Sequence, residues 1–162
     1  MKTFAIEFKW AIIFMVISLL WMVLEKLLGW HDALIDKHPI YTNLFAIVAI
    51  VSYFVAISDK KRNFYNFQIT WTQGFLSGVV ITIIVTLLNP VAQLITFEYI
   101  TPDYFTNAIK YSVDNKVMSR EQALAYFNLK SYILQATLGG LSMGVITSAI
   151  VAFFVKSKTT PI

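Results

Sequence analysis

The chain has 162 residues, of which 57% are hydrophobic and 14% are charged. Soluble domains contain about 25% charged residues, so the composition argues against an ordinary soluble domain. The net charge of +4 would suggest an acidic partner in a soluble protein, but here the positions of the charges matter more. Cysteine is absent, which excludes disulfides, thiolate metal sites and thiol nucleophiles.

The apolar residues are gathered in four long blocks. No charged residue occurs in 10–24, 41–57, 71–97 or 131–155. Each block is near the roughly 20 residues that cross a hydrocarbon layer about 30 Å thick. A helix on a soluble core would carry a charged face, which these blocks lack. The sequence predicts an all-α integral membrane protein, a single domain with four transmembrane helices at about 10–28, 41–57, 72–96 and 131–155.

The first predicted span, 10–28, resembles a secretory signal because Lys2 and Lys9 precede an apolar stretch. No small-x-small cleavage site follows, and three more blocks come after it, so we expect it to be retained as a span. Glu25 and Lys26 stand at its outer end, where we expect them to reach the membrane interface. The alternative for Glu25 is a role in proton relay.

The connection 29–40 contains four side chains of the types that bind metals, within eight residues. They are His31, Asp32, Asp36 and His38. In a short turn such residues are usually solvated, so we predict neither a metal site nor a cofactor. Metal binding by this group is the alternative.

The charges also predict an orientation. If the termini and the connection 58–70 share one side, that side has seven basic and two acidic residues, against six basic and seven acidic on the other. Lysine and arginine near span ends favour the cytoplasm, and the Lys60-Lys61-Arg62 cluster is the strongest single cue. We therefore predict that both termini are cytoplasmic.

Small residues recur every fourth position in the third and fourth spans. The residues expected to pack are Gly74, Gly78 and Thr82 in the third span and Gly140, Gly144 and Ser148 in the fourth. Such stripes allow helix backbones to approach closely in lipid, so we expect the two spans to meet along them. The alternative is that one stripe forms a homodimer face.

Polar residues interrupt the third span in its outer third, where Asn89 and Gln93 flank Pro90. Proline removes a backbone hydrogen bond, so a kink is expected. Gln135 lies at a similar depth in the fourth span. Polar groups there need partners, so we expect Glu25, Asn89, Gln93 and Gln135 to form one intramembrane cluster. We interpret it as structural, with a ligand or ion site as the alternative.

The segment 98–130 is amphipathic and predicts an extramembrane helical hairpin between spans three and four. Thr101-Pro102-Asp103 has the order of a cap, a first-turn proline and an acid, and predicts a helix from about Thr101 to Val113. Ser119 to Gln122 has the pattern of a capping box, which opens a second helix that can run straight into the fourth span. The apolar faces of these helices are expected to pack on each other or on the membrane, with a docking surface as the alternative.

No motif indicates an enzyme. Gly140-x-Ser142-x-Gly144 matches a nucleophile elbow, but it lies inside an apolar helix, whereas that motif needs a strand before the serine. The sequence also lacks a phosphate-binding loop and a dinucleotide fingerprint. We predict that the protein has no catalytic residues.

Several motifs occur together in order. They are Trp21-x-x-x-Glu25-Lys26-x-x-Gly29, Tyr41-Thr42-Asn43-Leu44-Phe45, Asn63-Phe64-Tyr65 before Trp71-x-Gln73-Gly74, and Thr101-Pro102-x-Tyr104-Phe105. With these motifs the chain resembles a bacterial family catalogued as domain of unknown function 4199, found mainly in Bacteroidota. The resemblance implies four spans and an inner-membrane location, and it carries no assigned activity or site residues.

These patterns predict a non-enzymatic inner-membrane protein, a structural or regulatory component that acts through helix packing and partner contacts. The lipid bilayer is the expected partner, a homo-oligomer or other membrane proteins come next, and nucleic acid is excluded. The alternative is a small transporter or channel subunit with a polar site near Asn89, Gln93, Gln135 and Glu25.

Overall fold

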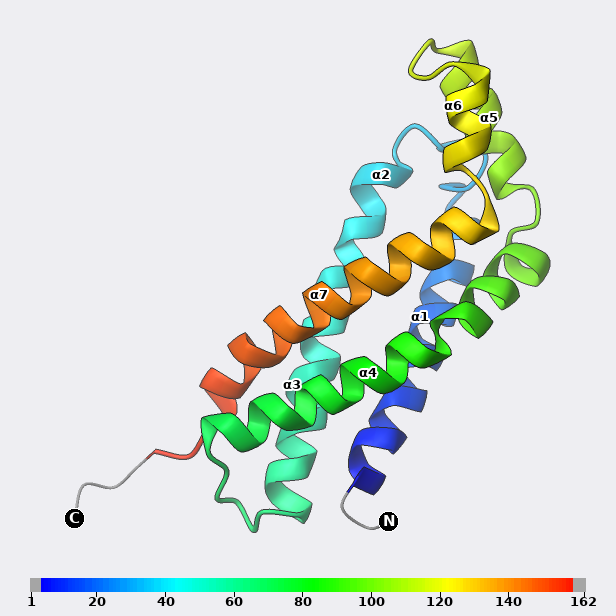
Figure 1. Cartoon of the computed structure of the whole chain (residues 1–162). Helices are drawn as coiled ribbons and strands as arrows, with labels where there is room; N and C mark the ends of the chain where they lie inside the picture. The colour runs from blue at the N-terminus through cyan, green and yellow to red at the C-terminus, as the bar shows by residue number, and fades with distance from the viewer. Residues whose placement is uncertain (1–3, 159–162) are drawn as a thin grey trace. The chain divides into compact units, whose positions relative to one another are not determined.

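The computed structural model describes residues 4–158, which form helices and no strand (Figure 1). The helices are α1 (Ala5–Leu27), α2 (His38–Tyr41), α3 (Phe45–Asn63), α4 (Trp71–Ile95), α5 (Tyr104–Asp114), α6 (Arg120–Tyr126) and α7 (Leu129–Val155). The prediction of an all-helical chain is therefore confirmed.

Four helical stretches are long and apolar enough to cross a membrane. Two of them join consecutive elements, because the 3-10 turn Thr42–Leu44 links α2 to α3 and the π-helical turn Thr96–Ile100 extends α4. The stretches are Ala5–Leu27, His38–Asn63, Trp71–Ile100 and Leu129–Val155, with 23, 26, 30 and 27 residues. Helix α4 continues through Pro90.

The described chain packs as two compact units. The first contains residues 4–14, 46–87 and 139–158, and the second contains residues 15–45 and 88–138. Helices α1, α4 and α7 each run from one unit into the other, whereas α3 lies almost wholly in the first. Each unit has its own hydrophobic core.

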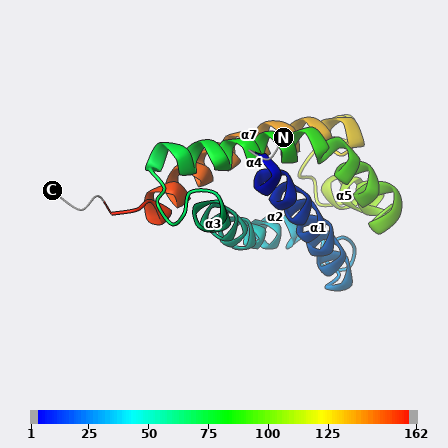
Figure 2. The same ribbon diagram turned by 90° about the horizontal axis from the view of Figure 1, so that it is seen from below.

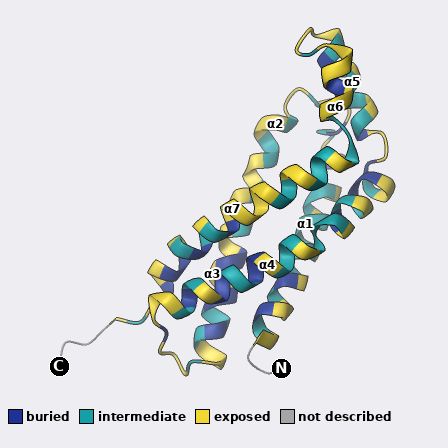
Figure 3. Ribbon diagram, viewed as in Figure 1, coloured by how far each residue is buried: buried dark blue, intermediate teal, exposed yellow. Residues whose placement is uncertain are grey.

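The core of the first unit lies where α3 packs against the other long helices. Tyr53 and Ile57 of α3 are buried with Ile81 of α4 and Val151 of α7. Gly74 adjoins this core, since a Cβ there would lie 3.4 Å from Ile57 Cγ2. Figure 3 shows buried and exposed residues on the same long helices.

Helices α4 and α7 meet in the first unit through small residues (Figures 1 and 2). A Cβ on Gly78 would lie 2.4 Å from Ser148 Oγ, and a Cβ on Gly144 would lie 2.4 Å from Thr82 Cγ2. Neither position has room for a methyl group. Gly140 differs, because a Cβ there would meet no atom within 4 Å. Gly74 also lies against α7, since a Cβ there would lie 3.2 Å from Ala152 Cβ. Close approach of the two helices thus involves five of the six predicted small residues, all except Gly140.

The second unit contains the short helices of the segment 98–130. Its core is aromatic, with Phe97, Tyr104 and Ala108 buried against Phe127 and Tyr132. The buried face of α5 consists of Tyr104, Ala108 and Ser112. The apolar face that the sequence indicated is therefore covered inside this unit.

The ends of these short helices differ partly from the prediction. The capping box is present, since Ser119 and Gln122 exchange side-chain and backbone hydrogen bonds at the start of α6. Helix α5 begins at Tyr104, three residues after Thr101, because a hydrogen-bonded turn comes first. Helix α6 does not run into the fourth span. It ends at Tyr126, and Asn128 Oδ1 accepts from the Ser131 amide at 2.9 Å to cap α7.

Candidate functional site

The end of α1 is shaped by Gly29, which has a φ of +75°. The Trp30 amide donates to the Glu25 carbonyl at 3.0 Å, and the Gly29 amide donates to the Lys26 carbonyl, also at 3.0 Å. This pair of bonds is a Schellman motif, in which a glycine in the left-handed region stops the helix and reverses the chain. The reversal brings His31 back to the last turns of α1.

Glu25 therefore meets two histidines. Its Oε2 lies 3.0 Å from His31 Nε2 and 3.3 Å from His38 Nε2, the latter on the first residue of α2. Glu25 is 0% exposed, His31 is 2% exposed and the His38 side chain is 14% exposed. The indole Nε1 of Trp21, one helical turn earlier, donates to Glu25 Oε1. Both carboxylate oxygens therefore have partners, and the group is shielded from solvent.

Tyr104 of α5 completes the site. Its hydroxyl lies 3.2 Å from His38 Nδ1 and 3.0 Å from the hydroxyl of Tyr132 on α7. Tyr104 is 3% exposed, and this burial, together with the neighbouring Tyr132, raises the pKa of its hydroxyl well above the ordinary value. The hydroxyl therefore keeps its proton, so it can donate one hydrogen bond while accepting another.

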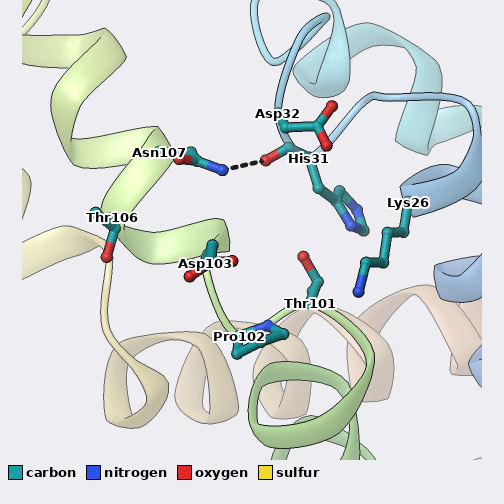
Figure 4. Close-up of a pocket in the computed structure, with 8 residues that line it drawn as sticks. All are labelled: Lys26, His31, Asp32, Thr101, Pro102, Asp103, Thr106 and Asn107. Atoms are coloured by element: carbon teal, nitrogen blue, oxygen red, sulfur yellow. Dashed lines mark hydrogen bonds between the residues drawn. The ribbon is translucent and has the colours of Figure 1, made fainter.

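A pocket of about 220 Å³ borders His31 (Figure 4). Asn107 of α5 donates to the His31 carbonyl at 3.1 Å, and Lys26 donates to the Ile100 carbonyl. Figure 4 shows the His31 ring beside Lys26, with Thr101 on the facing side. The lining residues are Lys26, His31, Asp32, Thr101, Pro102, Asp103, Thr106 and Asn107. The pocket lies inside the second unit and gives His31 a nearby polar space.

The predicted intramembrane cluster is only partly brought together. Gln93 donates to Asn89 Oδ1 at 3.2 Å, and Asn89 donates to Thr137 Oγ1 of α7 at 3.1 Å. Gln135 donates to Ser131 one turn earlier in its own helix. Glu25 has the histidines as partners instead.

A second buried charged group lies in the first unit. Lys60 Nζ of α3 lies 2.9 Å from Glu7 Oε1 of α1, and Ser77 of α4 donates to the same oxygen at 2.8 Å. Glu7 is 1% exposed and Lys60 is 2% exposed. The Lys60 ammonium also lies 3.8 Å from the centre of the Phe64 ring. This group is a paired and hydrogen-bonded ion pair, a structural arrangement that ties three helices together.

Sequence reasoning placed several of these residues wrongly. Glu25 and His31 are buried and His38 is half-buried, although the histidines were expected to be solvated, whereas Asp32 and Asp36 are exposed as expected. The available signal was Gly29, which follows Glu25 by four residues and is the residue that a Schellman turn requires. Lys60 was counted among the basic residues of the cytoplasmic side, and nothing in its local sequence indicates its distant partner Glu7.

The two histidines and the carboxylate of Glu25 offer three ligand atoms within 4.8 Å of one another. Two imidazoles and one carboxylate suit a transition-metal ion better than calcium or magnesium, which prefer oxygen ligands. Without an ion, the same groups make a hydrogen-bonded triad that holds the 28–37 connection against α1. Tyr104 supplies a protonated hydroxyl to either arrangement.

The fold and the site define an all-helical protein with four apolar helices of membrane-spanning length and a buried acid–histidine group at the end of the first. This architecture suggests a multi-pass membrane protein. The chain belongs to the family described as protein of unknown function (DUF4199), whose model matches residues 9–157. Neither the curated proteins nor the solved structures include a match to the chain.

Proposed function

We propose that the protein is a non-enzymatic component of the bacterial inner membrane, a single domain that crosses the bilayer four times. It acts in a structural or regulatory role through helix packing and contacts with other membrane proteins or a second copy. The segment 98–130 forms an extramembrane helical hairpin on the outer side. Lipid is the main partner of the four helices.

The outward-facing apolar residues carry this proposal. Leu20 of α1, Ile47 of α3, Leu87 of α4 and Phe154 of α7 are 62%, 63%, 74% and 70% exposed. Similar residues recur along all four helices, and Figure 3 shows exposed positions over their length. Monomeric soluble proteins rarely expose continuous apolar surface of this kind. In lipid such a surface is well solvated, and each helix closes its own backbone hydrogen bonds.

The proposed orientation has both termini in the cytoplasm. Lys60 is paired with Glu7, but Lys61 and Arg62 follow it at the end of α3. Lys61 donates to the Val155 carbonyl at the end of α7, which brings a basic residue to the last predicted span. Basic residues near span ends are retained in the cytoplasm, which supports this orientation.

The polar groups within the helices support a packing role rather than a transport pathway. Asn89 of α4 bonds to Thr137 and to the Ile133 carbonyl of α7, and Tyr53 of α3 bonds to Thr82 of α4 at 2.7 Å. These groups use their hydrogen-bonding capacity to join neighbouring helices.

Membrane insertion and orientation can be tested together in a chain that has no cysteine of its own. Single cysteines are introduced at exposed positions by Gln68→Cys, in the connection 64–70, and Asn115→Cys, between α5 and α6. In intact cells stripped of their outer membrane, an impermeant maleimide should label only the variant at position 115. After the membrane is opened, both variants should react.

Two outcomes would contradict this proposal. Release of the wild-type chain from membranes by alkaline carbonate would rule out four spans, and labelling of both cysteines from outside would rule out the orientation. The structural or regulatory role is tested by cross-linking in native cells followed by mass spectrometry. A chain that stays monomeric in mild detergent and captures no partner would exclude that role.

A further inference from the structure

The histidines beside Glu25 have the donor set and spacing of a metal centre. We propose that Glu25, His31 and His38 bind a divalent transition-metal ion of the zinc class at the end of α1. The proposal goes beyond the membrane role and does not depend on it, because all three residues lie within the second unit.

The spacing of the donor atoms supports this proposal. Glu25 Oε2 lies 3.0 Å from His31 Nε2 and 3.3 Å from His38 Nε2. Zinc bonds of about 2.0–2.1 Å in a tetrahedral site separate neighbouring ligand atoms by about 3.3 Å. Both carboxylate-to-imidazole distances are therefore close to the edge of such a tetrahedron. The three ligand atoms all lie within 4.8 Å of one another, and one ion binds all three once side-chain rotation brings the widest pair to the edge of the tetrahedron.

The second ring nitrogen of His31 has space for an outer partner. His31 is 2% exposed, and its Nδ1 is the buried side-chain polar atom without a hydrogen-bond partner among residues 4–158. Because His31 Nε2 faces Glu25, Nδ1 is not the ligand atom of the proposed centre, and it takes the position of an outer hydrogen-bonding group. The pocket of about 220 Å³ that His31 borders provides polar space for a water that pairs with Nδ1 while Nε2 binds the ion (Figure 4).

The surrounding hydrogen bonds orient the ligands as they do in metal centres. His38 Nδ1 lies 3.2 Å from the hydroxyl of Tyr104, so a proton on Nδ1 leaves the Nε2 lone pair directed at Glu25. Trp21 holds the other carboxylate oxygen, Oε1. Outer hydrogen bonds of this type fix the tautomer and the ring orientation of ligating histidines. Three protein ligands leave a fourth position for water or another small ligand.

Metal binding is tested on the full chain, purified in detergent with an affinity tag that contains no histidine. The protein is stripped with a chelator and titrated with Zn²⁺ in a calorimeter, and with Co²⁺ to record visible absorption. The wild type should bind about one zinc ion per chain and give the absorption of cobalt with nitrogen and oxygen ligands. An absence of saturable zinc binding would overturn the proposal.

Three variants locate the ion. Glu25→Gln and His31→Gln should each weaken zinc binding by more than the about 10–100-fold that loss of an outer hydrogen bond costs. Tyr104→Phe should weaken it by about 10–100-fold, because it removes only such an outer partner. Asp36→Asn is the matched control, since Asp36 is an exposed acid in the same connection, and it should bind zinc like the wild type.

Binding by His31→Gln with wild-type affinity, or loss of binding in Asp36→Asn, would overturn the assignment of the ligands. Circular dichroism shows whether each variant keeps its helices. If the ligand variants fail to fold, X-ray absorption at the zinc edge of the wild type identifies the ligands instead. Two imidazoles and oxygen at about 2.0–2.1 Å support the centre, and a shell without imidazole rejects it.

Discussion

Glu25 and His31 are six residues apart in the chain, and their side chains meet with Oε2 and Nε2 3.0 Å apart. A continuous helix would not bring them together, because residues six apart lie on different faces. Gly29 makes the contact possible by ending α1 with a φ of +75° and reversing the chain. The site at the end of α1 therefore depends on one backbone conformation as much as on its ligands.

Replacing Gly29 by alanine should destabilise the second unit. An L-residue in the left-handed region costs about 1–2 kcal/mol, and the added Cβ would lie 3.3 Å from Asp32 Oδ1. We expect a lower unfolding temperature in detergent, measured by circular dichroism, and weaker zinc binding in the same sample. Gly139→Ala is the control, because a Cβ there meets no atom within 4 Å. Equal unfolding temperatures for Gly29→Ala and the wild type would show that the reversal is not strained by a side chain.

Replacing Gly78 by alanine should separate α4 from α7. The new methyl group would lie 2.4 Å from Ser148 Oγ and 3.2 Å from Ser148 Cα, so the backbones must move apart. Overpacking of this kind costs about 1–3 kcal/mol. Gly140→Ala, in open space on α7, should instead be neutral or stabilising by up to about 1 kcal/mol. Thermal unfolding compares the two, and a Gly78→Ala variant as stable as Gly140→Ala would contradict the close contact.

Removing one partner of the buried ion pair should be costly. Lys60→Met leaves the Glu7 carboxylate buried without its cation, for which the expected loss is about 3–5 kcal/mol. The double variant Glu7→Gln with Lys60→Met should recover part of this loss, because no unpaired charge remains. Lys9→Met is the control, since the Lys9 ion pair with Asp59 is on the surface and such pairs contribute about 0–1 kcal/mol. Additive losses in the double variant would exclude coupling between the two buried residues.

Tyr104 should make the protein less stable in alkali. Its pKa is raised in the folded chain, above the ordinary 10.0, so below about pH 10 the residue is protonated in both states and has no effect on the pH dependence. Above that pH the unfolded chain loses the proton while the folded chain keeps it. The free energy of unfolding then falls by about 1.4 kcal/mol per pH unit from this residue.

Unfolding temperatures measured at about pH 9 and about pH 11 test this expectation. Tyr104→Phe should be less stable than the wild type at the lower pH, because it loses bonds to His38 and Tyr132, and the difference should shrink at the higher pH. Tyr99→Phe, at an exposed tyrosine, is the control for loss of a hydroxyl. A constant difference between Tyr104→Phe and the wild type would show that the hydroxyl ionises equally in both states.

The local sequence determined which segments are helical and where several of them begin. The four uncharged blocks can be recognised because each consists of consecutive residues. The Ser119 capping box needs only a serine and a glutamine three positions apart. The same local rules missed the start of α5 by three residues, because the turn at Thr101 competes with the helix. They also missed the break between α6 and α7. The chain leaves the helix before Asn128, and the side chain of Asn128 then caps the start of α7.

Only the tertiary structure decided which polar residues meet. Lys60 has the sequence context of a solvated lysine, yet it lies against Glu7, which is 53 residues away. Glu25 was expected beside Asn89, but the turn at Gly29 and the packing of α5 give it His31 and His38 instead. Helix formation depends on neighbours within about four residues. The pairing of distant side chains depends on how whole helices turn and pack, which a single sequence does not display.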